Sequence, residues 1–289
     1  MQEREGAKAQ GQLVVVATPL GNLGDISRRA LEILESADVV YCEDTRHSNK
    51  LFSAYAIAVR SRLESLHEHN EASQCARIVE RVRSDDTVVI ISDAGTPGIS
   101  DPGTRVVAAV AAAGLVVSTV PGPSAVIAAL SVSGLDTERF VMEGFVPRKR
   151  GDREHLYEQW ATETRTVIFY ESPQRVATTL EELAQRFGSR RAAVARELTK
   201  LHEEVIRGTL ADLAQQFLTR EVLGEIVVVL EGAEPPSPVD EATLRDALLD
   251  QLASGASVRD AASFVAEELG VSRRSAYRLA LELRDEQSH

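Results

Sequence analysis

TVVIISDAGTPGISDPG, residues 87–103, joins a short apolar run to a loop rich in glycine and proline. The apolar run, Val88 to Ile91, is β-branched throughout and bounded by polar residues, which is typical of a strand buried on both faces. Strands of this kind occur in parallel sheets, because helices cover both faces of such sheets. The run therefore predicts the central strand of a parallel sheet.

The loop after this strand is more heavily punctuated than a plain strand-to-helix connection requires. Within nine residues it holds three glycines and two prolines: Gly95, Pro97, Gly98, Pro102 and Gly103. Glycine permits close approach of a ligand to the backbone, and proline fixes the shape of a loop. Since open α/β sheets bind ligands at the carboxyl ends of their strands, we interpret the loop as a ligand site rather than a rigid connection.

The loop lacks the signature of a phosphate site. Residues 98–105 have the glycine spacing of a P-loop, but Thr104 and Arg105 stand where lysine followed by serine or threonine is needed. Asp93 and Asp101 would repel phosphates, whereas carboxylates and backbone carbonyls bind amines and hydroxyls. S-adenosylmethionine carries such groups and suits the loop.

The order of strand, glycine- or proline-rich loop and helix recurs along the first half of the chain. Strands are expected over residues 12–17, 37–42 and 115–120, followed by the loops 18–24, 43–46 and 121–125. Asp25 or Ser27 is expected to cap the first helix, and Gly114 to end a helix over 104–113. This repeat predicts a parallel α/β sheet.

The rest of the chain predicts a second sheet and a helical tail. Short strand patterns cover residues 140–145, 166–170, 192–196, 203–207 and 224–230, which indicates a mixed sheet in a second domain. A linker with three prolines spans 232–238. Residues 240–286 have a helical pattern in which Gly270 fits the turn of a helix-turn-helix, although small protein-docking modules share that pattern.

The fold expected from these patterns is α/β, with a parallel N-terminal sheet, a mixed second sheet and a small helical C-terminal module. We place a flexible tail at residues 1–11, an N-terminal α/β domain at 12–122, a second α/β domain at 123–233 and the helical module at 240–289.

Charge and composition limit how the chain can hold a partner. Its 289 residues carry a formal net charge of −12, with 44% hydrophobic and 26% charged residues, an ordinary globular composition. No apolar run approaches a membrane span and the polar start lacks a signal-peptide core, so we expect a cytoplasmic protein without membrane contact. Cys42 and Cys75 lack C-x-x-C spacing and are expected to be free, buried thiols.

An acidic protein can bind RNA only through a local basic patch. Two clusters qualify, and they contain Arg148, Lys149, Arg150 and Arg153 in the first case and Arg273, Arg274 and Arg278 in the second. The first cluster is the better candidate for gripping a phosphate backbone, although most basic runs are simply solvated loops.

Polar residues also follow the strand expected at 37–42. The sequence Glu43-Asp44-Thr45-Arg46 either points toward the ligand edge of the sheet or forms a helix cap with Arg46 as a surface partner, and the residues support both interpretations equally. His67 and His69 could face one side of an extended segment, but no third ligand is evident and no metal is expected.

Six motifs taken together resemble a known family. They are TPLGNLGD (18–25), EDTR (43–46), SDAGTPGISDPG (92–103), PGPSA (121–125), FYESP (169–173) and RELTK (196–200). In this order, and over nearly the whole chain, they resemble the tetrapyrrole methylase superfamily and, within it, methyltransferases of small-subunit ribosomal RNA. The resemblance implies methylation of the ribose 2'-oxygen of a decoding-centre cytidine in 16S rRNA, free or in the 30S subunit, with S-adenosylmethionine as donor. It also implies a homodimer, with the cofactor in a cleft between two α/β domains.

The resemblance carries a set of cofactor contacts onto this chain. These are Pro19, Asp93, Thr96, Ile99, Ser124, Ala125, Tyr170, Leu198 and Ile226, and we add Gly95 for the close approach that its backbone permits. Leu198 and Ile226 are apolar and could hold the adenine ring between them.

Removal of the hydroxyl proton calls for a general base, for which Asp44, Glu197 and Lys200 are candidates. Lys200 could act as a base only with a depressed pKa; otherwise it would hold a phosphate or lie on the surface. Two rival functions stay open: methylation of a tetrapyrrole precursor, and non-catalytic regulation through a tail that binds nucleic acid. The glycine-rich loops count against the second rival, because a binding module needs no cofactor cleft.

Overall fold

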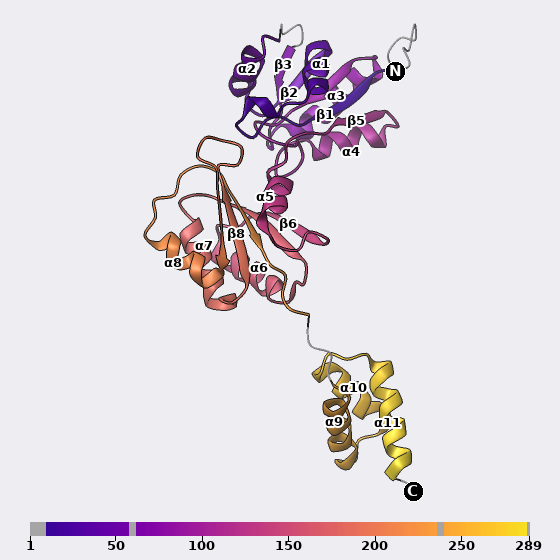
Figure 1. The fold of residues 1–289 in the computed structure, drawn as a ribbon. Helices are drawn as coiled ribbons and strands as arrows, with labels where there is room; N and C mark the ends of the chain where they lie inside the picture. The colour runs from indigo at the N-terminus through magenta and orange to yellow at the C-terminus, as the bar shows by residue number, and fades with distance from the viewer. Residues whose placement is uncertain (1–9, 58–61, 236–239, 288–289) are drawn as a thin grey trace. The chain divides into compact units, whose positions relative to one another are not determined.

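The computed structural model describes residues 10–57, 62–235 and 240–287. Its contacts divide the chain into two units, Met1–Ala233 and Glu234–His289. Among the described residues, the first unit holds two five-stranded sheets and the second is helical (Figure 1). The predicted α/β fold is confirmed. Most of the tail predicted at 1–11 lies outside the described residues, as do residues 236–238 of the linker, whereas Gly11 is buried.

The first sheet is parallel throughout, as predicted. Its strands are β1 (Gln12–Val16), β2 (Val39–Cys42), β3 (Arg62–Ser65), β4 (Thr87–Ile90) and β5 (Val116–Val120), in the spatial order β3-β2-β4-β1-β5. Val89 of β4 lies between Val14 of β1 and Val40 of β2, which confirms β4 as the central strand. Strand β3 was not predicted, because Glu64 and Ser65 interrupt its apolar pattern.

Helices cover both faces of the first sheet. Helices α1 (Arg28–Ser36) and α2 (Thr45–Ala54) pack on one face, and α3 (Glu71–Arg83) and α4 (Thr104–Ala112) pack on the other. The chain thus leaves the adjacent strands β1 and β4 toward opposite faces. At such a switch point the two connections diverge and leave a crevice outside the carboxyl ends of the strands, where α/β sheets bind ligands.

Two local expectations for this region are refined by the structure. Ser27 caps α1 by accepting the N–H of Ala30 at 3.1 Å, while Asp25 belongs to a short 3-10 helix, Leu23–Asp25. His67 follows the end of β3, and His69 lies in the turn before α3 rather than in an extended segment.

The second sheet is mixed, as predicted. Its strands are β6 (Phe140–Phe145), β7 (Thr166–Glu171), β8 (Arg191–Arg196), β9 (Glu204–Thr209) and β10 (Ile226–Leu230), in the order β6-β7-β10-β8-β9. Strand β6 is parallel to β7, and every other neighbouring pair is antiparallel.

Two separate cores hold the second sheet. Helix α5 (Ala125–Ser133) packs on one face, and α6 (Arg150–Thr162), α7 (Val176–Phe187) and α8 (Leu210–Leu218) pack on the other. Strand β10 serves both cores, because its successive apolar side chains point to opposite faces. The last strand of the first sheet ends at Val120, and α5 packs on the second sheet. We therefore propose a domain boundary near Gly122.

The second unit contains α9 (Glu241–Ala253), α10 (Val258–Glu268) and α11 (Arg273–Gln287). Gly270 turns the chain between α10 and α11 at φ +65°, as the helix-turn-helix pattern predicts. Within the described part of the chain, the core among these helices is formed by residues of this unit, including Leu248, Val265 and Ala280. Among the described residues, no helix is long and apolar enough to cross a membrane.

Candidate active site

The loop that follows β4 is paired with the loop that follows β1. Thr18 and Gly95 exchange two backbone hydrogen bonds, at 2.8 Å and 3.0 Å, and the Thr18 hydroxyl donates to the carbonyl of Ser92 at 3.0 Å. Thr96 in turn donates its hydroxyl to the carbonyl of Pro123 at 3.0 Å. Three glycine- or proline-rich loops of the sequence are therefore joined at the carboxyl edge of the first sheet.

A buried carboxylate fixes the end of the β4 loop. Glu71, only 6% exposed, accepts the backbone N–H groups of Gly103 at 2.9 Å and Arg105 at 2.8 Å through the same oxygen, Oε1. The loop also closes on itself, because the N–H of Gly98 donates to the carbonyl of Pro102 at 3.2 Å. These contacts make residues 96–105 a rigid wall rather than a loose connection.

Replacing Glu71 by alanine is expected to lower the free energy of unfolding by roughly 3 kcal/mol, because hydrogen bonds from two amides to a charged group are lost. Urea unfolding measures the effect. Glu71→Gln keeps an oxygen acceptor at the same place and serves as the matched control with a smaller loss. A change below about 0.5 kcal/mol in Glu71→Ala, the range of ordinary surface substitutions, would contradict the bracing role.

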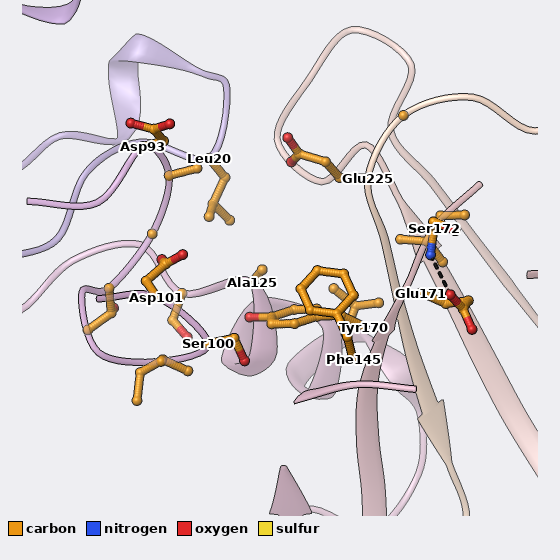
Figure 2. A pocket seen from close by; sticks show the side chains of 18 of the residues that line it. Leu20, Asp93, Ser100, Asp101, Ala125, Phe145, Tyr170, Glu171, Ser172 and Glu225 are labelled. Carbon is orange, nitrogen blue, oxygen red and sulfur yellow. Dashed lines mark hydrogen bonds between the residues drawn. The ribbon is translucent and has the colours of Figure 1, made fainter. Parts of the chain in front are cut away.

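A cleft of about 390 Å³ opens between these loops and the edge of the second sheet (Figure 2). The first sheet contributes Leu20 and the 93–101 loop, and the second contributes Phe145, the stretch 170–173 and residues 224–227. Phe145 and Tyr170 pack with their ring centroids 5.2 Å apart and form an aromatic wall. The volume lies in the usual range for small-molecule sites.

Eight of the ten residues predicted to contact the cofactor line this cleft: Asp93, Gly95, Thr96, Ile99, Ser124, Ala125, Tyr170 and Ile226. Pro19 does not line it, and its neighbour Leu20 does. Leu198 packs beside the core under α5 instead. The lining residues absent from the predicted set are Leu20, Ala94, Ser100, Asp101, Phe145, Glu171, Ser172, Pro173, Gly224, Glu225 and Val227.

Acidic groups gather on the side of the cleft formed by the first sheet. Burial raises the pKa of Asp101 to about 6, and the charges of Glu43 and Asp93 add to the rise. Burial, followed by the charge of Asp93, also raises the pKa of Glu43. The accumulated negative charge favours a cationic ligand and disfavours a phosphate at this position.

Lys200 and Glu197, two candidates for the general base, form an ion pair at the rim. The Lys200 Nζ lies 3.0 Å from Glu197 Oε1 and 3.2 Å from Oε2 of Glu225, which lines the cleft. Burial alone lowers the pKa of Lys200, but hydrogen bonds and charges of the two carboxylates outweigh burial and raise it. Lys200 is therefore an ammonium group, and the neutral form that a lysine base requires is disfavoured.

The loop that carries this pair has a strained backbone. Glu197 has φ +52° and Thr199 φ +65°, left-handed values that side chains other than glycine adopt at a cost. Lys200 lies against the Gly21 backbone, where an added Cβ would come within 2.5 Å of the lysine Cγ. The ELTK loop thus packs on the first glycine-rich loop.

Asp44 caps α2, as one of the two interpretations of the EDTR segment predicts. Its side chain accepts the N–H of Arg46 at 2.7 Å and caps α2, while its own N–H donates to Asp93 at 3.2 Å. Asp44 does not line the cleft but lies one hydrogen bond away from a residue that does. The Arg46 side chain is exposed.

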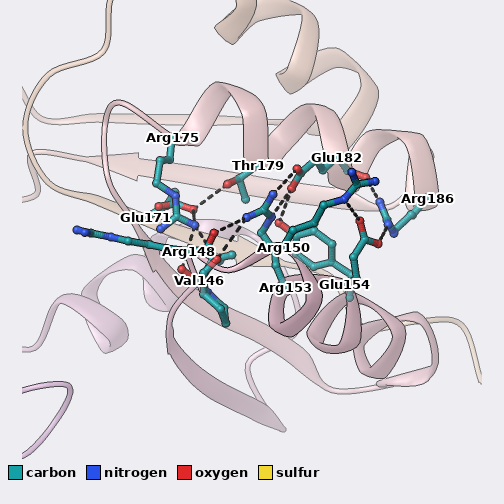
Figure 3. Close-up of polar contacts among 12 residues, drawn as sticks. Val146, Arg148, Arg150, Arg153, Glu154, Glu171, Arg175, Thr179, Glu182 and Arg186 are labelled. Carbon is teal, nitrogen blue, oxygen red and sulfur yellow. Dashed lines mark hydrogen bonds and ion pairs between the residues drawn. The ribbon is translucent and has the colours of Figure 1, made fainter.

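The first basic cluster overlaps a helix, because α6 already begins at Arg150 (Figure 3). Arg148, Lys149 and Arg150 are exposed. Arg153 instead forms two hydrogen bonds to Glu182, both at 2.8 Å, and its side chain is only 17% exposed. Its charge is committed inside the fold.

Two arginines hold the loop that presents this cluster. Arg175 donates to the carbonyls of Val146 at 3.0 Å and Pro147 at 3.1 Å, and Arg153 donates to that of Arg148 at 3.2 Å. Arg175 also pairs at 3.3 Å with Glu171, which lines the cleft (Figure 3). The exposed cations are therefore fixed to the cleft wall.

The second basic cluster lies at the start of α11. Arg273, Arg274, Tyr277 and Arg278 are all exposed, and no acidic residue occurs between Glu268 and Glu282. The side chain of Ser272 accepts the N–H of Ser275 at 3.1 Å, as a helix cap does. The surface at this helix end is cationic, although the whole chain is acidic.

Comparison with known proteins defines the class. The family model of tetrapyrrole (corrin/porphyrin) methylases matches residues 12–214, so the chain belongs to this family. A solved uroporphyrin-III C-methyltransferase of Thermus thermophilus, in complex with S-adenosylhomocysteine, has the same fold: TM-score 0.53, 19% identity, 76% of this chain and 97% of that one covered.

Within that class, curated relatives identify a narrower family. Ribosomal RNA small subunit methyltransferase I of Synechocystis is 43% identical, over 94% of this chain and 98% of its own. The protein of the same name from Xylella fastidiosa is 46% identical, over 92% and 98%. A model described as the RsmI C-terminal HTH domain matches residues 239–284. The chain belongs to the ribosomal RNA small subunit methyltransferase I family.

Proposed function

We propose that this protein transfers the methyl group of S-adenosylmethionine to the ribose 2'-oxygen of a decoding-centre cytidine in 16S rRNA. The observation that carries the proposal is the cleft, which collects eight predicted cofactor contacts from both sheets of a tetrapyrrole methylase fold. The names of the relatives supply the class of RNA.

The residues of the cleft fit S-adenosylmethionine chemically. Asp93 and Glu225 are acceptors for its amine and hydroxyl groups and complement its positive charge. Ile226, Phe145 and Tyr170 offer an apolar surface for adenine, in place of the expected pair of Leu198 and Ile226. The backbone of Gly95 permits close approach. Bound there, the cofactor supplies a methyl group that its positively charged sulfur makes reactive.

The protein contributes position more than covalent chemistry. Rigid loops that hold the reacting atoms at short range convert a bimolecular reaction into an effectively unimolecular one. This positioning can supply much of the rate of methyl transfer. The braced 96–105 loop and the strained ELTK loop are rigid elements of this kind. Lys200 pairs with Glu197 and Glu225, and as an ammonium it has a third N–H that is suited to hold a phosphate of the RNA beside the cleft.

Lys200→Ala is expected to lower turnover roughly tenfold, about 1.4 kcal/mol of barrier, while the affinity for S-adenosylmethionine changes little. The lost contact is to RNA, and Glu197 and Glu225 are left as unpaired negative charges near it. Lys200→Arg keeps the charge and should recover part of the rate. Steady-state kinetics and titration calorimetry measure the two quantities; unchanged turnover in Lys200→Ala would place the RNA elsewhere.

Exposed cations account for RNA binding by an acidic protein. We assign phosphate contacts to Arg148, Lys149 and Arg150 on the first unit and to Arg273, Arg274 and Arg278 on α11. Arg46 is exposed and available for the same role. Arg153 serves by holding the loop in place, since Glu182 occupies its guanidinium.

A homodimer and a cytoplasmic location complete the proposal. Helix α5 is apolar nearly all round, and Ile127 and Val132 on it are 53% and 41% exposed. A second copy of the chain would cover such a face. Ribosomal RNA as substrate places the reaction in the cytoplasm.

One assay tests the function against its rivals. Radiolabelled methyl transfer is measured on 30S subunits, free 16S rRNA and a tetrapyrrole precursor, and labelled RNA is hydrolysed in alkali. A 2'-O-methyl group blocks cleavage at its own nucleotide, so the label should remain in an alkali-stable dinucleotide. Label in the tetrapyrrole alone, or in no substrate, would overturn the proposal.

A further inference from the structure

Four carboxylates line the cleft: Asp93, Asp101, Glu171 and Glu225. Glu171 accepts hydrogen bonds from the Ser172 N–H and the Thr179 hydroxyl, both at 2.7 Å, and pairs with Arg175. Glu225 pairs with Lys200, and Asp93 accepts the N–H of Asp44. Among the described residues, no basic side chain pairs with Asp101.

The position of Asp101 is set by the braced loop. Ser100, immediately before it, has φ +61°, a left-handed conformation that turns the chain at this point. The Gly98–Pro102 hydrogen bond closes the turn around Asp101, and Glu71 anchors the residues that follow. Across the cleft, Tyr170 extends from the second sheet toward this loop (Figure 2). The carboxylate is held on a rigid element that faces the space for ligands.

The groups that face Asp101 set its protonation. Burial first, then the charges of Glu43 and Asp93, raise its pKa to about 6. Burial, followed by the charge of Asp101, raises the pKa of Tyr170 to about 12, so the phenol stays protonated and cannot serve as the base. Above pH 6 Asp101 is ionised and still basic enough to accept a proton, as efficient general bases are.

We propose that Asp101 is the general base of the reaction, an assignment that rests on the function proposed above. Its carboxylate accepts the proton of the attacking ribose hydroxyl while that oxygen forms its bond to the methyl carbon. The carbon–sulfur bond breaks and its electron pair stays on sulfur, which leaves S-adenosylhomocysteine, the methylated ribose and a protonated Asp101. Water then takes the proton away. With this assignment, the role of general base does not fall to Asp44, Glu197 or Lys200.

Asp101→Asn tests the assignment because it removes the basic oxygen and keeps the shape. Turnover on the RNA substrate is expected to fall by ~10²–10⁴, the usual contribution of a general base, while the affinity for S-adenosylmethionine, measured by calorimetry, should fall far less than the turnover. In the unmodified protein the rate should rise with pH through about 6 and then level off. The residual rate of Asp101→Asn should lack this rise.

Glu43→Gln is the matched control, because it removes a neighbouring charge that raises the pKa of Asp101. Its rate profile should move to lower pH, a shift that a purely structural role of Asp101 would not produce. The carboxyl signal of Asp101 in the NMR spectrum of the free protein, assigned by its loss in Asp101→Asn, should titrate near pH 6 and shift down in Glu43→Gln.

Three results would overturn the assignment. One is a rate within about threefold of the unmodified protein in Asp101→Asn, since that is below any general-base contribution. Another is loss of S-adenosylmethionine binding in that variant, which would make Asp101 a cofactor ligand instead. The third is an unmodified protein that methylates no RNA, which removes the proposed function and the base together; the first two leave the function standing.

Discussion

Gly95→Val is expected to weaken S-adenosylmethionine binding by on the order of a hundredfold, about 2.7 kcal/mol. Gly95 has φ +81°, a left-handed conformation that costs a side chain roughly 1–2 kcal/mol. Its added Cβ would meet the Leu20 Cδ2 at 3.2 Å, and Leu20 lines the cleft. The valine methyl groups would extend further and occupy space where the cofactor approaches the backbone.

The same substitution disturbs the joint between two loops. Gly95 exchanges its backbone hydrogen bonds with Thr18, so a shift of Gly95 moves the loop after β1 as well. The two loops leave adjacent strands at the switch point of the sheet, and both contribute to the wall of the cleft. We therefore expect the loss in affinity to exceed what a single blocked contact would cause.

Gly114→Val separates conformational strain from damage to the site. Gly114 also has a positive φ, +69°, but its added Cβ would meet no atom of the other described residues within 4 Å, and it does not line the cleft. This variant should lose stability and keep its affinity in titration calorimetry. If Gly95→Val and the unmodified protein have equal affinity for S-adenosylmethionine, the cofactor does not bind at this loop.

Local patterns were sufficient to predict most strands of both sheets. The β-branched run at 88–91 is buried on both faces by two layers of helices, so its composition directly reflects its place. Strand β3 was not predicted because it lies at the edge of the sheet, beside β2, and an edge strand tolerates polar residues. The spatial order of the strands could not be predicted from local sequence, because it depends on how the connections between strands cross the sheet.

The same contrast holds at the cleft. Gly95, Thr96 and Ile99 belong to a loop whose glycines and prolines predict a ligand site, and all three line the cleft. Phe145 is the last residue of β6, and Glu225 immediately precedes β10. Both reach the cleft only through the packing of the second sheet, which cannot be predicted from their local sequence.

Electrostatics were the least predictable feature of the site. The protonation of Lys200 depends on Glu225, a residue of a different loop that comes to lie 3.2 Å away. Sequence spacing could bring Glu197 and Lys200 together within one motif, but it could not supply the second carboxylate that keeps the lysine charged.

Removal of the helical unit separates RNA binding from cofactor binding. Among the residues that the structure describes, the core among α9, α10 and α11 shares no member with the cores of the two sheets, so a chain that ends at Ala233 is expected to fold. Because all the residues of the cleft precede Ala233, this chain should bind S-adenosylmethionine with nearly unchanged affinity. It should methylate RNA poorly, since the cationic end of α11 is gone.

Arginine-to-glutamine substitution at 273, 274 and 278 localises that loss to phosphate contacts. Each contact of an arginine with a phosphate releases counterions. Loss of the three arginine contacts should therefore make the slope of log affinity against log salt concentration less steep, by ~0.7–0.9 per contact. Glutamine at the exposed positions Arg28, Arg83 and Arg191 makes the same change in net charge outside both basic clusters, and the slope should stay as in the unmodified protein. RNA binding measured across a salt series distinguishes the two triple variants. If both triple variants have the same slope, the net charge of the protein acts on RNA and α11 makes no specific contact with it. If only the α11 variant has a shallower slope, the acidic protein holds its RNA through a small cationic surface, and repulsion by the rest of its charge makes that binding selective.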